Sequence, residues 1–472
     1  MNNEELCYLS AIDLASAIRD KSVSPVEVTQ AVLDRIERLN PVLNAFCISM
    51  ADEAMETAKA AEAAVMRGDE LGPLHGVPIP VKDNLYIKGV RTTFGSKLLE
   101  HNITEFDAPI IERLKKAGAV IVGRTNSPEF GWKGVTDNLI FGETRNPWNV
   151  KLTPGGSSGG SSAAVAAGMG PIGIGTDGGG SLRIPASFCG IVGLKPSLGR
   201  VPTYPGVSVG SMRHIGGMTR TVADSALLLN VIAGPDERDS ESLPASDTDY
   251  LAELDKGISG LRIAYSADLG YAQVDPEVAA LCEAAALRLS EAGAIVEQVN
   301  LDWSDPYECW NVFFYGSSAD RLGDELAKNS HLLDPGLRLA VERAVLVSIR
   351  DYTTALSIRN DFWQQVRQVY ETYDLLLTPA LAVPPFPLGQ NNADPFPGQT
   401  ERDLQWTQFT YPFNLTGQPA CSVPCGWTKS NLPVGLQIVG GRFDDATVLR
   451  AARALEKIQP WSDRRPDVPE TL

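Results

Sequence analysis

Two glycine-rich segments each carry a serine that could act as a nucleophile. The stretch GGSSGG, residues 155–160, contains Ser157 in a G-x-S-x-G pattern, which is typical of serine hydrolases that attack from a sharp turn. The stretch TDGGGSLRIP, residues 176–185, places Ser181 after three glycines. Backbone N–H groups that no side chain covers can converge on one point and bind an oxyanion. These segments indicate acyl transfer through a serine, with a plain glycine-rich turn as the alternative.

Histidine is the usual base for such a serine, but the histidines of this chain have unsuitable settings. In hydrolases with a nucleophile elbow, the histidine lies downstream of the serine, near the C-terminal end. The chain has four histidines, and the two downstream ones, His214 and His331, lack the strand-end setting that this role needs. A Ser–His–Asp triad is therefore disfavoured.

Nucleotide binding also fits these glycines poorly. The run GIGTDG, residues 173–178, matches G-x-G-x-x-G, which in dinucleotide-binding folds lies between a strand and a helix. However, we expect no helix to start cleanly within 176–185, and no acidic residue between Asp177 and Asp224 is present to bind a ribose. A G-x-x-x-x-G-K-[ST] phosphate loop is also missing there.

A buried lysine is the remaining group that could activate a serine. Lys82 follows the apolar run GVPIPV, residues 76–81, which would carry it inward, and it precedes Asp83 and Asn84, which could orient it. Burial lowers the pKa of a lysine because desolvation disfavours the charged form, and a neutral amine can accept a proton. The alternative is an ordinary strand end with the ammonium group in solvent. Local context alone leaves both open.

Capping signals and hydrophobic periodicity indicate the elements that position these groups. Ser24, Pro25 and Glu27 form a helix start with a capping box, so we expect a helix over 24–39; another, over 50–68, ends at Gly68. The further expected elements are a strand in 76–84, helix–Gly–strand units in 107–126 and 278–299, long helices over about 308–329 and 336–372, strands in 374–380 and 432–440, a closing helix in 443–457, and a surface loop beside a site over 379–403. This alternation predicts one large α/β domain with a largely parallel or mixed sheet.

Composition limits the class of protein. The 472 residues include 41 Lys and Arg against 58 Asp and Glu, and the net charge of −17 argues against general binding to nucleic acid or anionic membranes. Neither an 18-residue apolar span nor a signal peptide is visible. The seven scattered cysteines, Cys421 and Cys425 among them, fit free thiols in a reducing cytosol better than a zinc site. We therefore expect a cytoplasmic protein with no nucleic-acid or membrane partner.

The lysine segment and the two serine segments together closely resemble the amidase signature family. GVPIPVKDN at 76–84, GGSSGG at 155–160 and GTDGGGSLRIPASFCGIVGLKPS at 175–197 carry the resemblance, which covers nearly the whole chain. It also includes GRTNSPEFGWKG, TRNPWN, GGMTRTVADSALLL, LLLTPA and PVGLQIVG. The resemblance implies one domain over 1–472, with a central mixed β-sheet covered by helices on both faces. Its signature core would lie at about 70–235, completed by the N-terminal helices and a C-terminal α/β part.

The family resemblance implies a Ser–cisSer–Lys triad. By match of motif, Ser181 is the nucleophile, Ser157 is the bridging serine in a cis peptide and relays the proton, and Lys82 is the base. Ser158 would support the relay by hydrogen bonding. In that case the G-x-S-x-G match of Ser157 is coincidental. The resemblance also implies catalysis without a metal or an organic cofactor.

The resemblance further implies where the substrate is held. The N–H groups of residues 178–181, which include Gly178, Gly179 and Gly180, would form the oxyanion hole. Many family members have a Thr or an aliphatic residue where this chain has Gly178, so we expect a roomier pocket there. In the family, the segment around Trp132 lies beside the acyl or leaving group, which makes Trp132 a candidate substrate-binding residue.

The resemblance leaves three alternatives for the function. One branch of the family hydrolyses amides directly. Another is the glutaminase subunit of the tRNA-dependent amidotransferase, which carries an Asp ahead of its P-x-N-L-x-G segment. Here Thr407 lies near that place and no acid occurs over 404–419, although Arg359 could pair with a carboxylate or form a structural ion pair. The third alternative, a non-catalytic binding member, is disfavoured by the intact triad.

Aromatic residues favour the first alternative. They are dense near the expected pocket, and we expect two or three of the following to line it: Phe130, Trp132, Trp310, Phe313, Phe314, Tyr315, Trp406, Phe409 and Tyr411. We therefore expect hydrolysis of rather apolar linear amides, aryl or alkyl, together with some esters and carbamates. Because family members are often homodimers, a homodimer is one expected assembly.

Overall fold

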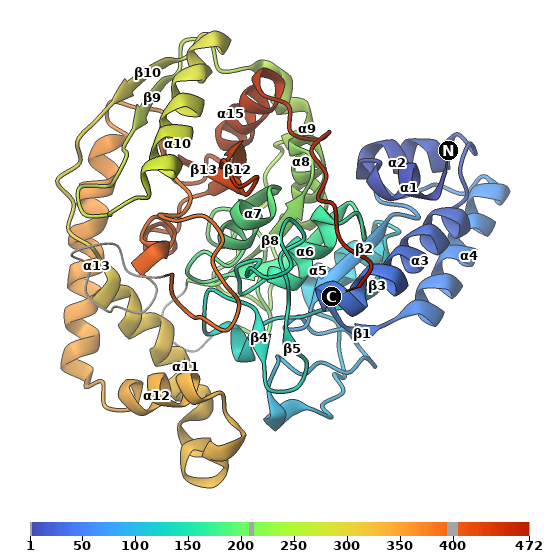
Figure 1. Ribbon diagram of the computed structural model, residues 1–472, viewed down its shortest axis with the longest axis horizontal. Coiled ribbons are helices and arrows are strands. Elements are labelled where there is room, and N and C mark those ends of the chain that lie inside the picture. The colour runs from blue at the N-terminus through green and yellow to red at the C-terminus, as the bar shows by residue number, and fades with distance from the viewer. Residues whose placement is uncertain (1, 207–211, 394–404, 472) are drawn as a thin grey trace.

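One large sheet extends through the molecule (Figure 1). The structure is a computed structural model that describes residues 2–206, 212–393 and 405–471. Its order is β1–β3–β2–β6–β8–β7–β12–β13–β11–β9–β10. The strands are β1 Phe46–Ser49, β2 Pro78–Lys82, β3 Val120–Thr125, β6 Ile172–Asp177, β7 Val192–Lys195, β8 His214–Thr219, β9 Arg262–Tyr265, β10 Ile295–Gln298, β11 Leu375–Pro379, β12 Ala420–Trp427 and β13 Pro433–Gly440, while β4 Asp137–Asn138 and β5 Gly142–Glu143 form a separate pair. Four pairs are parallel (β2 with β3 and β6, β9 with β10 and β11) and the others are antiparallel, so the sheet is mixed, as predicted.

Helices cover both faces of this sheet, which confirms the predicted fold class. The α-helices are α1 Asn3–Tyr8, α2 Ala11–Arg19, α3 Pro25–Leu43, α4 Ala51–Arg67, α5 Pro109–Lys116, α6 Gly159–Ala166, α7 Arg183–Cys189, α8 Val222–Ile232, α9 Tyr250–Glu253, α10 Pro276–Arg288, α11 Tyr307–Asn329, α12 Pro335–Ala344, α13 Ile349–Val369, α14 Pro412–Leu415 and α15 Asp445–Ile458. A Cβ at Gly173 would lie 3.0 Å from Val165 on α6, and one at Gly217 would lie 2.1 Å from Leu228 on α8. Gly173 pairs with Met218, and successive strand residues face opposite sides, so α6 and α8 pack on opposite faces.

β2 carries Lys82 to the edge of the sheet where three parallel strands end. Lys82 lies opposite Thr125, the last residue of β3, and β6 ends at Asp177. Because parallel strands share their direction, their carboxyl ends meet at the same edge, the usual place for a site in such sheets. The loop before α6 and the segment 178–182 between β6 and α7 lie beyond these ends, and they carry the two candidate serines.

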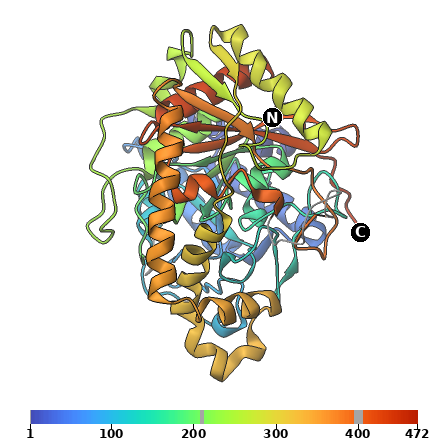
Figure 2. The ribbon, with the colours of Figure 1, turned by 90° about the vertical axis from the view of Figure 1, so that its left-hand side faces the viewer.

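α11, α12 and α13 form a further layer of helices beside the sheet (Figure 2). The expectation of one helix over 336–372 is wrong, because α12 ends at Ala344 and α13 begins at Ile349. Ser348 accepts a hydrogen bond from the N–H of Asp351, and the Asp351 carboxylate accepts one from the N–H of Ser348. This capping box starts a new helix within the predicted one.

Most of the other expected elements are confirmed. α3 begins with the predicted capping box, and α4 ends at Gly68, which has a left-handed backbone. The expectation that no helix starts cleanly within 176–185 is wrong, since α7 starts at Arg183. No helix in the part of the chain that the structure describes is long and apolar enough to cross a membrane.

The expected surface loop over 379–403 is buried in its first part. Leu381 and Phe386 are 2 % and 6 % exposed and pack into an apolar cluster with Trp406. This segment therefore supports the site region from the interior rather than lying over it. Residues 394–403 of the loop lie outside the described residues.

Candidate active site

Lys82 is fully buried against three hydroxyl groups. Its Nζ lies 2.6 Å from Ser157 Oγ, 3.0 Å from Ser158 Oγ and 3.2 Å from Thr176 Oγ1. The expected inward direction of Lys82 is confirmed, and the alternative of an ammonium group in solvent is wrong. Each hydroxyl can donate or accept a hydrogen bond, so this arrangement accommodates a neutral amine as well as an ammonium group.

The surroundings of Lys82 favour its neutral form. Burial lowers the pKa of Lys82 well below its ordinary value, and the nearby positive charge of Arg213 lowers it further, while Asp177 raises it. Desolvation is the larger effect because the charged form loses its hydration inside the protein. A lysine in this state can accept a proton from a neighbouring hydroxyl at neutral pH.

Only one of the two residues expected to orient Lys82 does so. Asn84 Nδ2 donates a 2.9 Å hydrogen bond to Thr176 Oγ1, the same oxygen that lies beside Lys82 Nζ. Asp83 instead forms a buried ion pair with Arg124, with 3.3 Å between Oδ1 and Nη2. The expectation for Asp83 is therefore wrong, because this carboxylate serves the packing of β2 against β3.

The two candidate serines open onto one cavity. Ser157 follows a cis peptide bond from Gly156, and Ser181 is followed by Leu182, the N-cap residue of α7. The N–H of Ser158 donates to the carbonyl of Ser181 at 3.2 Å, which ties the two loops together. Among the residues that the structure describes, no hydrogen bond joins Ser157 Oγ to Ser181 Oγ, so the serines share a cavity without a direct link.

The carbonyl groups of the glycine segment are each held by a donor. These donors are Asn414 Nδ2 for Asp177 (3.2 Å), Trp310 Nε1 for Gly178 (3.0 Å), Thr410 Oγ1 for Gly179 (2.6 Å), and the N–H of Ile184 for Gly180 (2.7 Å). In a trans peptide the C=O and the following N–H point in opposite directions. Holding the carbonyl of Gly178 therefore fixes the direction of the Gly179 N–H.

Two glycines of this segment differ from expectation. The N–H of Gly180 already donates to Asp177 Oδ1 at 2.7 Å, which leaves the N–H groups of Gly178, Gly179 and Ser181 for an incoming oxyanion. The pocket is also not left open at Gly178, because a Cβ there would lie 3.0 Å from Phe314 Cε2. The ring of Phe314 fills the space that a larger residue would take.

The cavity that Ser157 and Ser181 share measures about 810 Å³ with its open mouth. Four of the nine aromatic residues expected near it contribute to its lining, namely Phe130, Trp132, Phe313 and Phe314, against the two or three that we expected. Phe94 also lines it and was missed. Among the described residues, none of the side chains that line the cavity is acidic.

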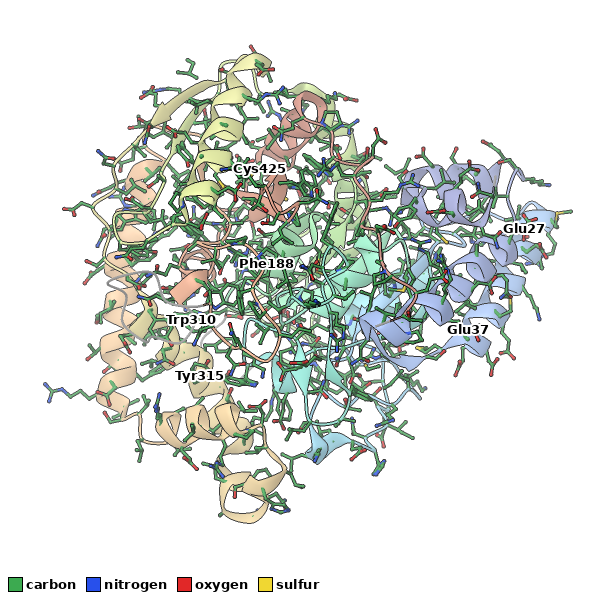
Figure 3. The ribbon with its side chains drawn as sticks, in the orientation of Figure 1. Glu27, Glu37, Phe188, Trp310, Tyr315 and Cys425 are labelled. Carbon is green, nitrogen blue, oxygen red and sulfur yellow. The ribbon has the colours of Figure 1, made fainter. Side chains whose placement is uncertain are left out.

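Trp310 supports the glycine segment from outside the cavity lining. It stacks on Phe314 with 4.5 Å between ring centroids, and it lies beside Tyr315 on α11 (Figure 3). Trp132 lines the cavity on another side, where its ring packs against Gly336 of α12. The Trp132 Nε1 donor is buried without a hydrogen-bond partner in the described structure.

Sequence reasoning missed two charged residues of the cavity, Arg213 and Arg321. Arg213 directly precedes β8, and Arg321 lies on α11 among other polar residues. Nothing in the local pattern distinguishes either residue from an arginine exposed to solvent. Only the packing of α11 near the end of β2 places both guanidinium groups at one cavity.

Several groups considered as alternatives lie away from the cavity. None of the four histidines, all of which the structure describes, lines it, and His214 is buried with its Nε2 3.2 Å from Lys195 Nζ. Arg359 does not line it either. Its Nε donates to the carbonyl of Leu415 at 2.6 Å, and its guanidinium lies over the ring of Phe313. Arg359 therefore has a structural role in packing α13.

Comparison with known proteins places the chain in a family. The Amidase family model matches residues 27–449. The chain is 39 % identical to an acylamidase of Rhodococcus erythropolis (99 % of this chain and 98 % of the relative) and 39 % identical to one subunit of the glutamyl-tRNA(Gln) amidotransferase of Moorella thermoacetica (98 % and 99 %). A solved bacterial aryl acylamidase of the amidase signature enzymes superposes with a TM-score of 0.90 at 33 % identity (96 % of this chain and 97 % of that one). The chain therefore belongs to the amidase signature family of amide hydrolases.

Proposed function

We propose that this protein hydrolyses the carbon–nitrogen bond of rather apolar linear amides, aryl or alkyl, through an acyl-enzyme on Ser181. The observation that carries the proposal is the buried Lys82 amine, 2.6 Å from Ser157 Oγ, at a cavity that Ser157 and Ser181 share. Neutral Lys82 accepts the proton of Ser157 while Ser157 takes the proton of Ser181, and Ser181 Oγ attacks the carbonyl carbon. The proton returns by the same route to the leaving nitrogen, and water then hydrolyses the ester to release the acid.

The relay requires Ser157 and Ser181 to come into hydrogen-bond contact when substrate binds. Catalytic hydrogen bonds are often long without substrate and shorten in the complex, and rotation about one Cα–Cβ bond moves a serine oxygen between staggered positions. Lys82 Nζ also contacts Ser158 Oγ at 3.0 Å, which supports its position beside Ser157. The amides of Gly178, Gly179 and Ser181 would hold the oxyanion, and one such donor is worth about 3–4 kcal/mol of transition-state stabilisation.

The lining of the cavity supports an apolar substrate over glutamine. Five aromatic rings line it, and no acidic side chain among the described residues does. The ammonium group of glutamine would lose its hydration there without gaining an ionic partner, which is costly. The names of the acylamidase and the aryl acylamidase agree with this choice. The amidotransferase relative is equally identical in sequence, so a glutaminase subunit is the second candidate.

The test is hydrolysis by the purified chain of 4-nitroacetanilide, butyramide, glutamine, 4-nitrophenyl acetate and an aryl carbamate. Ser181→Ala is the blank, and Ser162→Ala is the matched control, because Ser162 Oγ is buried without a partner in the described structure. We expect turnover of the anilide, butyramide, the ester and the carbamate that only Ser181→Ala abolishes. Faster turnover of glutamine than of any anilide would support the glutaminase subunit instead.

A further inference from the structure

Two guanidinium groups line the candidate cavity, and the proposed reaction uses neither of them. Arg213 and Arg321 share this cavity with Ser157 and Ser181. The other described lining residues are aromatic, aliphatic, hydroxyl, thioether, amide or glycine residues, and none of them carries a carboxylate. Burial desolvates Arg213, and a desolvated charge is normally paired because leaving it unpaired is costly. The arrangement therefore calls for a negative charge on the molecule that the cavity binds.

Arg213 is held in place while most of its donors remain available. Its Nη2 donates to the carbonyl of Asn84 at 3.2 Å, a neutral partner on the loop after Lys82. Burial lowers the pKa of Arg213 to about 10, and the nearby charge of Arg321 contributes to that lowering, while Tyr86 raises it. Arg213 stays protonated at neutral pH and, in the part of the chain that the structure describes, has no carboxylate among the groups that act on its charge.

Arg321 is held by the aromatic wall of the same cavity. Its guanidinium lies 5.4 Å from the ring centroid of Phe130 and 6.0 Å from that of Phe94, and both rings line the cavity. Stacking uses the flat face of a guanidinium and leaves its N–H edge free to bind an oxyanion. Arg321 is exposed, so it lies toward solvent, whereas Arg213 is half-buried.

We propose that Arg213 and Arg321 bind a carboxylate at the end of the substrate, so that the preferred amide has an apolar aryl or alkyl body and one terminal carboxylate. This inference rests on the proposed function. Two guanidinium groups that repel each other gain from an anion between them, and a carboxylate accepts bidentate hydrogen bonds from arginine. The apolar body would fill the aromatic part of the cavity. Glutamine does not fit this class, since its ammonium group has no partner among the described lining residues.

The experiment compares matched neutral and anionic anilides. In the first pair, N-(4-nitrophenyl)succinamate carries a carboxylate on its acyl side, and 4-nitrobutyranilide is its neutral counterpart. In the second pair, 4-acetamidobenzoate carries the carboxylate on its leaving group, and 4-methylacetanilide is its neutral counterpart. The measured quantity is the ratio of kcat/KM for the anionic and the neutral member of each pair. Arg213→Met and Arg321→Met are compared with Lys328→Met, which removes one exposed positive charge from the same helix outside the cavity.

We expect one pair to show an anionic preference that falls about ten- to hundredfold in each arginine variant, the range for a lost charged hydrogen bond, and stays unchanged in Lys328→Met. Comparing ratios cancels any effect of Arg213 on the pKa of Lys82, which acts on both substrates. A neutral preference in both pairs, unchanged by either arginine substitution, would overturn the inference while Ser181-dependent turnover of neutral anilides upheld the proposed function. No Ser181-dependent turnover of any anilide would overturn the proposed function itself.

If an arginine variant does not fold, binding of the same compounds to the Ser181→Ala protein tests whether the cavity prefers a carboxylate. Calorimetric titration with 4-acetamidobenzoate and N-(4-nitrophenyl)succinamate, against their neutral partners, measures the affinity of the carboxylate directly. We expect one anionic compound to bind at least tenfold more tightly than its neutral partner, with the advantage reduced in high salt because screening weakens charge–charge attraction. Equal affinity within both pairs would overturn the inference.

Discussion

Adding one methyl group at Gly179 should reduce catalysis without unfolding the protein. The backbone of Gly179 lies outside the left-handed region, so Gly179→Ala adds only a Cβ atom. That atom would lie 2.6 Å from Trp310 Cζ2, well inside the ~3.5 Å of favourable carbon contacts. Trp310 cannot turn away freely, because it stacks on Phe314 and packs against Tyr411 with 5.5 Å between ring centroids. The glycine segment must therefore move, and with it the N–H of Gly179.

The expected loss follows from that displacement. A misplacement of roughly 1 Å at reacting groups costs about a hundredfold in rate. Trp310→Phe alone removes the 3.0 Å hydrogen bond to the carbonyl of Gly178, and such a bond contributes about 0.5–1.5 kcal/mol, which corresponds to a roughly two- to thirteenfold loss in kcat/KM. The double variant lacks the clashing Cζ2 atom, so its loss should be smaller than the product of the two single losses.

The assay is kcat/KM for 4-nitroacetanilide in the four proteins of this cycle, with thermal unfolding as the control for folding. Gly178→Ala provides a second comparison, since its Cβ would meet Phe314 Cε2 at 3.0 Å, a less severe contact. If Gly179→Ala retained more than half of the wild-type activity, or if the two losses simply multiplied, the assignment of this N–H to the oxyanion would be refuted.

Four further substitutions test other parts of the site. Lys82→Met should abolish amide turnover. In the wild type, kcat/KM should rise with pH through the lowered pKa of Lys82. Arg213→Met should move this rise to higher pH in a pH–rate profile, because the charge of Arg213 lowers the pKa of Lys82. Arg183→Met should lower the free energy of unfolding by about 3–5 kcal/mol in urea denaturation, because it leaves the buried Asp177 carboxylate without its 2.9 Å partner. Gly178→Thr should reduce turnover of bulky anilides more than that of butyramide, since Phe314 occupies the adjoining space; equal losses in a substrate series would contradict this.

Local signals predicted the elements well where the deciding interactions are short-range. The capping box of Ser24 and Glu27 marks the start of α3, and the left-handed residue Gly68 marks the end of α4. Both signals could be predicted because they involve residues only a few positions apart. The predicted helix over 336–372 was wrong for a local reason as well. Ser348 and Asp351 form a start signal that a helical hydrophobic pattern on both sides obscured.

The sequence by itself determined the family, through the combination of motifs around Lys82, Ser157 and Ser181. Tertiary structure alone decided what surrounds them. Trp310 and Thr410 hold the carbonyls of the glycine segment from elements far along the chain. These contacts depend on how separate elements pack, and sequence spacing carries no record of such long-range distances.

The character of the cavity was likewise decided by packing. Arg213, which directly precedes β8, and Arg321 on α11 are separated in sequence, and each alone is an ordinary arginine. The folded chain brings them to one aromatic-lined cavity without an acidic side chain among its described residues. The chemical role of a charged side chain depends on its burial and its neighbours, and both of these are properties of the tertiary structure.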